Sequence, residues 1–305
     1  MIARQPDGAP VGNSVALSGK FVRCPHGCGR TVENGGVDDV LARILSWAEA
    51  QDAVRAVVLT STRARREGPP DALSDYDVIV ALDDLDRFDP AAAYGEPVAR
   101  WGDEHDVHGT TAFSRGVVYE DGVKVDWTLW PADVCELVAE RGLTDALDVG
   151  YRVLFDKDGA TARWAAPTFR AHIPARPSEA EYVALVEEFW WSVTYVAKAR
   201  ARGERFFERF VLEVDLTHGV LRRLLEWLVE TERGWDWKPG AYGRGLERAL
   251  PPELAAEVDA AAGSFERTVA LFRRVAHEVG ERLGYPYPQR ADDAVSATVD
   301  TLRNG

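Results

Sequence analysis

The spacing of apolar residues changes near residue 177, and this change constrains the fold more than any other feature of the chain. Before it, apolar residues come in short runs typical of buried strands, as at residues 55–60 and 75–82. After it, they recur at helical intervals over residues 179–202, 205–231, 252–262, 264–283 and 291–302. We therefore expect an α+β chain whose sheet-forming part precedes an all-helical part.

Turn and helix signals in the sequence predict the remaining elements of the first part. They predict a helix from Val37, a hairpin between residues 111–120 and 123–130 around Asp121-Gly122, a helix at 132–141 and a strand at 151–155. Residues 1–36 are rich in Gly, Pro, Asn and Ser and show no apolar period, so we expect a disordered tail. The two domains are then residues 37–176 and 177–305.

Charge and cysteine content narrow the function. Lys and Arg number 36 against 50 Asp and Glu, a net charge of −14, which argues against nucleic acid or an anionic membrane as partner. The N-terminus has no apolar signal region, no run approaches the length of a membrane span, and three cysteines are too few for a disulfide framework. We expect a cytoplasmic protein, a monomer or weak dimer. Cys24 and Cys28 resemble half a zinc ribbon, but no second pair follows, so an inert tail is favoured.

Three aspartates carry the strongest chemical signal. Asp75 and Asp77 alternate with apolar residues on one strand, which places both carboxylates on one face about 7 Å apart. Asp126 occupies the polar face of a second strand. Oxygen ligands in this arrangement suit Mg²⁺ completed by water and nucleotide phosphates. The alternative is a set of solvated strand-edge acids, although aspartate is depleted in strands.

Five motifs in order resemble the bacterial aminoglycoside 6-adenylyltransferases (streptomycin adenylyltransferases) of the DNA polymerase β-like nucleotidyltransferase superfamily. They are DYD at 75–77, KVDWTLWP at 124–131, VLFDKD at 153–158, EFW at 188–190 with Tyr195 and Lys198, and ERLGYPYP at 281–288. The resemblance covers residues 37–303. It implies a nucleotidyltransferase domain with a mixed sheet flanked by helices, followed by a helical substrate-binding domain.

The resemblance also implies roles for residues. Asp75 and Asp77 would hold Mg²⁺, and Asp126 would take the proton of the acceptor hydroxyl or share a second metal. The turn Ser61-Thr62-Arg63 would bind the triphosphate of ATP, although the family turn usually reads Gly-Ser-Arg. Glycine lets the backbone approach a phosphate closely, so Ser61 is a departure. The alternative for Arg63 is a surface arginine.

Further candidates lie outside the acids. Lys157 follows a strand end and is either a phosphate contact or a turn lysine. Glu188, Trp191, Tyr195 and Lys198 share one helical face, where Glu188 would receive a cationic drug and Lys198 would reach the triphosphate. The alternative is a core stripe, which would be aliphatic at its ends. Asp106, in the acidic stretch 103–106, is either a contact for the cation or part of a solvated loop.

The expected function is transfer of AMP from ATP to a hydroxyl of an aminoglycoside, with streptomycin at its 6-position foremost. One alternative is a nucleotide-binding regulatory protein that kept the fold and lost efficient catalysis, which Ser61 favours and the intact carboxylate trio opposes. Another is a nucleotidyltransferase with a different small or protein acceptor.

Overall fold

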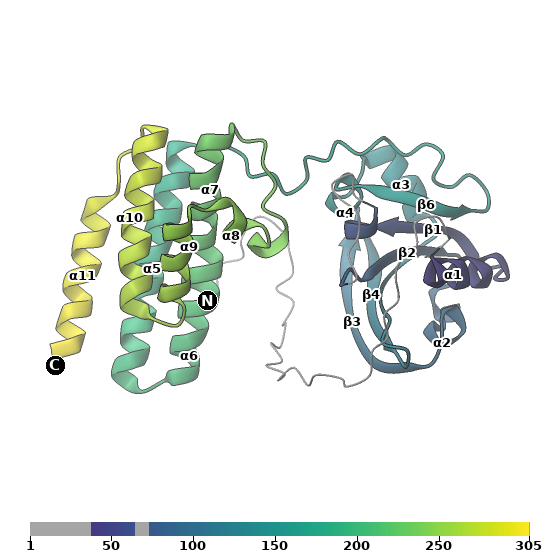
Figure 1. Cartoon of the computed structure of the whole chain (residues 1–305), viewed down its shortest axis with the longest axis horizontal. Helices are drawn as coiled ribbons and strands as arrows, with labels where there is room; N and C mark the ends of the chain where they lie inside the picture. Colours follow the sequence, from purple (N-terminus) through teal and green to yellow (C-terminus); the bar gives the residue numbers. More distant parts are fainter. Residues whose placement is uncertain (1–37, 65–72, 305) are drawn as a thin grey trace. The chain divides into compact units, whose positions relative to one another are not determined.

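The computed structural model describes residues 38–64 and 73–304. The chain divides into two compact units, Met1–Phe169 and Arg170–Gly305, so the boundary lies slightly before the one expected at residue 177 (Figure 1). The expected tail at residues 1–36, with Cys24 and Cys28, lies outside the described residues.

The first unit is built on a mixed sheet. Within the described ranges its six strands are β1 (Val54–Thr60), β2 (Tyr76–Leu82), β3 (Pro97–Val107), β4 (Thr110–Tyr119), β5 (Lys124–Pro131) and β6 (Tyr151–Asp156). They lie in the order β3-β4-β5-β2-β1-β6. The central pair β2 and β5 is parallel, and the other pairs are antiparallel. The predicted mixed sheet flanked by helices is therefore confirmed.

Helices pack on both faces of this sheet. On one face α1 (Asp39–Glu49) and α2 (Pro90–Ala93) share a core with strand residues such as Val78 and Trp127. On the other face α3 (Val134–Arg141) and α4 (Asp145–Asp148) cover Ile79, Ala81 and Trp130. Because α3 and α4 cover this face only from Ile79 onward, the polar residues at the start of β2 and β5 stay half-exposed. The three predicted strands at 55–60, 75–82 and 151–155 and the hairpin around Gly122, whose φ is 81°, are confirmed.

Strand β3 was not predicted. The acidic stretch 103–106, for which a solvated loop was one expectation, lies in this strand and pairs with β4 from Val107 to Ala99. It escaped the pattern analysis because β3 is an edge strand that is exposed along most of its length, so no apolar alternation marks it.

The connection after β1 is a strained turn. Thr60 ends β1, and Ser61 opens the single 3₁₀ turn η1 (Ser61–Arg63) with a φ of 58°. This left-handed conformation is free of cost for glycine and costs other residues about 1 kcal/mol or more. Such strain persists only where the surrounding structure imposes it, and it clusters at functional sites.

The second unit is helical. Its helices are α5 (Glu179–Arg202), α6 (Arg205–Phe210), α7 (Arg222–Arg233), α8 (Leu246–Ala249), α9 (Pro252–Ala261), α10 (Phe265–Leu283) and α11 (Gln289–Asn304), with a 3₁₀ turn η4 (Ala241–Gly243). Figure 1 shows α5, α10 and α11 running alongside one another. Ser178 and Glu181 form a capping box at the start of α5, and Gly203 ends it in the left-handed conformation, which explains why its bounds were predictable. Among the described residues, no helix is long and apolar enough to cross a membrane.

The expected helix at 205–231 contains a wider segment. Between α6 and α7 the chain forms a π-helix, η3 (Val211–Leu221), which packs against α5. π-Helical turns are rare and are frequently found at functional sites. Nothing in the apolar spacing distinguishes this segment from an ordinary α-helix.

Two substitutions of Ser61 separate backbone strain from side-chain chemistry. Ser61→Gly removes the strain, so we expect a melting temperature equal to or above that of the wild type. Ser61→Ala keeps the strain and loses the hydroxyl, so we expect a lower melting temperature than for Ser61→Gly. Calorimetry of the ligand-free variants decides; a glycine variant less stable than the alanine variant would contradict a strained turn.

Candidate active site on the sheet

Sheet register brings the predicted acids together. Asp77 on β2 and Asp126 on β5 are direct partners in the parallel pairing. Asp75 lies two residues before Asp77, and side chains alternate along a strand, so all three carboxylates emerge from the same face. Tyr76 and Val125 alternate with them and are buried on the opposite face. The strand geometry expected from the sequence is therefore present.

Lys124 neutralises part of this cluster. Its ammonium Nζ donates hydrogen bonds to Oδ2 of Asp75 at 2.8 Å and to Oδ2 of Asp126 at 2.7 Å. Burial opposes the charge of Lys124, but the two carboxylates outweigh burial and raise its pKa. The position that a cation would take between the acids is thus held by a cation of the chain itself.

Asp77 is the acid without a full counter-charge. Burial raises the pKa of Asp77 to about 6, and the nearby Asp126 carboxylate adds to the rise. The Ser61 hydroxyl lies within hydrogen-bonding reach of Asp77 and acts in the opposite direction, as does Lys124. A buried carboxylate beside like charge is stabilised by any added cation.

The turn after β1 supports the acids in two ways. Ser61 interacts with Asp77, as described, and Arg63 holds the backbone ahead of β2. The Arg63 guanidinium donates to the carbonyl of Asp75 at 3.1 Å and to that of Ser74 at 2.9 Å. It also pairs with Asp38 at 3.2 Å and lies 3.7 Å over the Tyr76 ring. Arg63 therefore positions Asp75 through the main chain and is not a loose surface arginine; Thr62, half-buried, completes the turn.

Two predicted site residues, Lys157 and Asp106, lie away from the three aspartates. The backbone N–H of Lys157 bonds to Arg55 at the start of β1, so about 20 Å of strand separates it from Ser61. Its ammonium pairs with Asp52 at 3.6 Å. Asp106 accepts a hydrogen bond from the N–H of Gly109 at 3.0 Å and thereby closes the β3–β4 turn. Strand alternation places Asp106 on the face opposite Asp126.

The predicted helical stripe exists on α5. Trp191 packs edge-to-face on Tyr195 with ring centroids 4.7 Å apart, and Lys198 lies 5.9 Å from the Tyr195 ring. Phe207 of α6 extends the row, 6.1 Å from Tyr195. Trp191 remains 61% exposed, so this is a surface and not a core stripe.

Glu188 begins the same stripe and has a carboxylate neighbour that the sequence did not reveal. Asp215, on the π-helix, is half-buried, and both burial and the charge of Glu188 raise its pKa. The sequence did not reveal this neighbour because Asp215 is far from Glu188 along the chain, and the two meet only where the π-helix packs against α5. The helical unit thus presents two like charges beside an aromatic surface.

Other residues of the site were missed. Lys124 lies two positions before Asp126, a spacing that places both on one face of β5, so the sequence did hold this signal. Gly116 of β4 is the register partner of Asp126, and Trp101 of β3 is the register partner of Gly116. The pairing of Trp101 with Gly116 required β3, which was not predicted.

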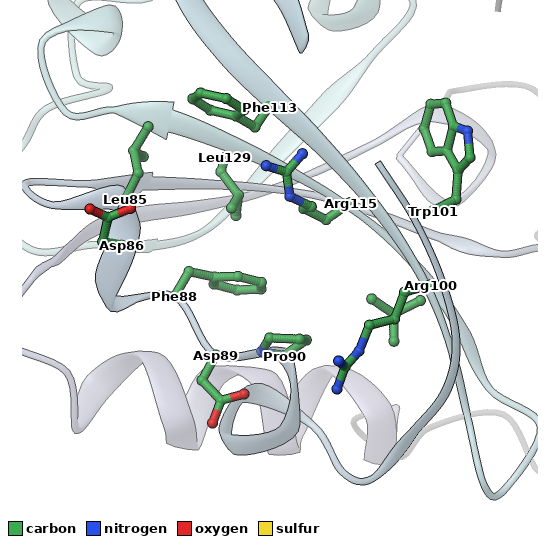
Figure 2. Close-up of a pocket in the computed structure, with 11 residues that line it drawn as sticks. Leu85, Asp86, Phe88, Asp89, Pro90, Arg100, Trp101, Phe113, Arg115 and Leu129 are labelled. Atoms are coloured by element: carbon green, nitrogen blue, oxygen red, sulfur yellow. The ribbon is translucent and has the colours of Figure 1, made fainter. Parts of the chain in front are cut away.

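A pocket of about 440 Å³ lies on the opposite face of the sheet, between β3, β4 and the segment 85–90. Figure 2 shows Arg100 reaching toward it from the strand side, and Phe88 and Asp89 on its other side. Phe113 and Leu129, which line it, belong to the face away from the acids. This pocket is therefore separate from the carboxylate site.

The donor set has the chemistry that Mg²⁺ prefers. Among residues 38–64 and 73–304, no group of three His, Cys, Asp or Glu side chains is already arranged to hold a metal ion. The ion pairs of Lys124 explain this, because they draw Asp75 and Asp126 onto its ammonium. Mg²⁺ commonly uses only one or two carboxylates and completes its shell with water and substrate phosphates. The three aspartates fit such a site once the ammonium of Lys124 moves away from Asp75 and Asp126.

The raised pKa of Asp77 predicts a pH-dependent stability. An aspartate in an unfolded chain titrates near 3.9, so between that pH and about 6 the unfolded state loses its proton first and folding becomes less favourable. Asp77→Asn stays neutral, and we expect it to raise the melting temperature of the metal-free protein more at pH 8 than at pH 5. Asp75→Asn is the control, because it breaks the pair with Lys124 and gains nothing at pH 8. A gain for Asp77→Asn that is the same at both pH values would refute the assignment.

Comparison with known proteins now adds to this geometry. A family model described as streptomycin adenylyltransferase matches residues 37–302. An aminoglycoside 6-adenylyltransferase of Campylobacter jejuni is 28% identical over 80% of this chain and 88% of its own length. One from Bacillus subtilis (strain 168) is 27% identical over 80% of this chain and 90% of its own length. A crystal structure of an aminoglycoside 6-adenyltransferase from Bacillus subtilis is 21% identical over 87% of this chain and 98% of that one, at a TM-score of 0.40. The family model alone spans most of the chain, and the chain therefore belongs to the streptomycin adenylyltransferase family and is an adenylyltransferase.

Proposed function

We propose that this enzyme transfers AMP from ATP to a hydroxyl group of an aminoglycoside, with streptomycin at its 6-position as the first candidate, and so confers resistance. One observation carries the proposal: three carboxylates lie on one sheet face, two of them in register, and a single lysine pairs with Asp75 and Asp126. Relatives of this chain are named aminoglycoside 6-adenylyltransferases, which supports the acceptor class. The net charge of −14 favours a cationic acceptor.

In the proposed reaction the acceptor hydroxyl attacks the α-phosphorus of ATP. A new O–P bond forms, the bond to pyrophosphate breaks, and the hydroxyl proton passes to Asp126. Asp75 and Asp77 would hold Mg²⁺, which when bound supplies charge neutralisation on the phosphate oxygens. The N–H groups of the turn from Ser61 would bind phosphate, and Arg63 fixes the backbone of Asp75 while they do so.

Lys124 stabilises the cluster of carboxylates before a substrate binds. Its ammonium offsets the repulsion between carboxylates, and its flexible stem lets the charge move when another cation enters. Asp126 is then released from its ion pair and can accept a proton. On the helical unit, Glu188 and Asp215 would bind ammonium or guanidinium groups of the acceptor.

Replacing the acids one at a time separates their roles. We expect Asp126→Asn to fold and to bind ATP with Mg²⁺, yet to lose about 10²–10⁴-fold in turnover, the contribution of a positioned base. Asp75→Asn and Asp77→Asn should lose Mg²⁺-dependent ATP binding as well. ATP titrations with and without Mg²⁺, beside rates of pyrophosphate release across an aminoglycoside panel, measure both. Wild-type turnover in Asp126→Asn would exclude it as the base, and a wild-type protein inactive with every acceptor would favour a regulatory role.

Glu188 tests the acceptor-binding surface. We expect Glu188→Gln to weaken streptomycin binding by roughly 1.5–3 kcal/mol, the worth of one charge-assisted hydrogen bond, and to leave ATP binding unchanged. Glu179→Gln is the matched control, because Glu179 is an exposed glutamate of the same helix that lies on the face opposite Glu188. Calorimetry with each ligand separately gives the answer. Equal losses for both ligands, or an equal effect of the control, would give Glu188 a structural role.

A further inference from the structure

Gly116 lets an exposed tryptophan and the proposed base lie close together. Trp101 on β3, Gly116 on β4 and Asp126 on β5 are successive register partners, so their side-chain positions form one row on the face of the acids. A Cβ added to Gly116 would lie 3.1 Å from Oδ1 of Asp126 and 3.6 Å from the Trp101 ring. The indole and the carboxylate therefore approach each other over Gly116, and a methyl group at this position would crowd both.

Nothing in the backbone requires glycine at position 116. Gly116 is absent from the residues with positive φ, so another residue could adopt its conformation. Glycine in the middle of a strand weakens the strand and often marks a place where a ligand approaches closely. The close approach of Trp101 and Asp126 over Gly116 is accordingly a reason for the glycine.

Trp101 stays exposed beside Asp126. Its side chain is 56% exposed, although it is a large hydrophobic residue on an edge strand. Trp101 also lines the pocket near Arg100 and Arg115, and Figure 2 shows its indole apart from Phe88 and Phe113. Asp103, two residues further along β3, shares the face of Trp101 and adds a carboxylate. An indole face among carboxylates attracts cations by the ring quadrupole and by charge.

The order of the strands indicates which of the two substrates contacts Trp101. In the proposed reaction, on which this inference rests, the attacking and leaving oxygens lie roughly in line through phosphorus. The phosphate-binding turn follows β1, the acids lie on β2 and β5, and Trp101 lies beyond them on β3. With pyrophosphate leaving toward β1, the acceptor arrives from the side of β4 and β3.

We propose that Trp101 is an acceptor-specificity residue: its indole face receives a cationic group of the aminoglycoside while the acceptor hydroxyl reaches Asp126 beside it. Trp101 makes direct contact with the acceptor and takes no part in proton transfer. Gly116 acts by letting the indole lie this close to the carboxylate.

The test uses the full chain, streptomycin with an aminoglycoside panel, and steady-state kinetics. We expect Trp101→Leu to raise KM for the acceptor at least tenfold and to change KM for ATP less than twofold, whereas Trp101→Phe recovers most of the affinity because an aromatic face remains. Glu104→Leu is the control, since Glu104 lies on the same edge strand and faces the other way. Gly116→Ala should raise the acceptor KM at least tenfold without lowering the melting temperature.

Each other outcome overturns a defined part of the account. If Trp101→Leu raises KM for ATP and spares the acceptor, the indole stacks on the base of ATP and the inference is wrong. If Trp101→Leu and Glu104→Leu behave alike, or Gly116→Ala merely lowers the melting temperature, the row is structural. If the wild-type protein adenylylates no aminoglycoside of the panel, the proposed function fails first, and the inference fails with it.

Discussion

The repulsion between Asp77 and Asp126 is the constraint on which the site depends. Parallel pairing of β2 and β5 fixes the two carboxylates as neighbours, and neither can turn to the buried face. In the metal-free protein the repulsion is met in two ways, by the ammonium of Lys124 and by the raised pKa of Asp77. Both reduce the cost of the repulsion, and a bound cation would reduce it further, which is the basis of the proposed magnesium site.

The surrounding structure holds this cluster in place. Arg63 binds the carbonyls before β2, Asp38 receives Arg63 and the hydroxyl of Tyr76, and Ser61 keeps a left-handed backbone beside Asp77. Strain and like charge are both unfavourable for folding, and the apolar cores on the two sheet faces offset them. Ser61 therefore keeps the left-handed backbone conformation that a glycine would adopt at this turn.

The sequence predicted the parts that follow from local patterns. The acids on β2 and β5 could be placed because apolar residues alternate with them, and α5 because Ser178 and Gly203 cap it. Strand β3 carries no such pattern, so Trp101 and its pairing with Gly116 were out of reach. The partner of Glu188, Asp215, depends on helix packing and a π-helix. Lys157 matched a motif, but strand pairing places it at the far end of β1 from the turn.

Crystals of the protein grown with Mn²⁺ and a non-hydrolysable ATP analogue would test the central claim most directly, through the anomalous signal of the metal. Our account predicts Mn²⁺ bound to oxygens of Asp75 and Asp77, with the ammonium of Lys124 moved away from Asp75. A nucleotide bound with Lys124 still bridging Asp75 and Asp126, and with Mn²⁺ absent from these carboxylates, would contradict it.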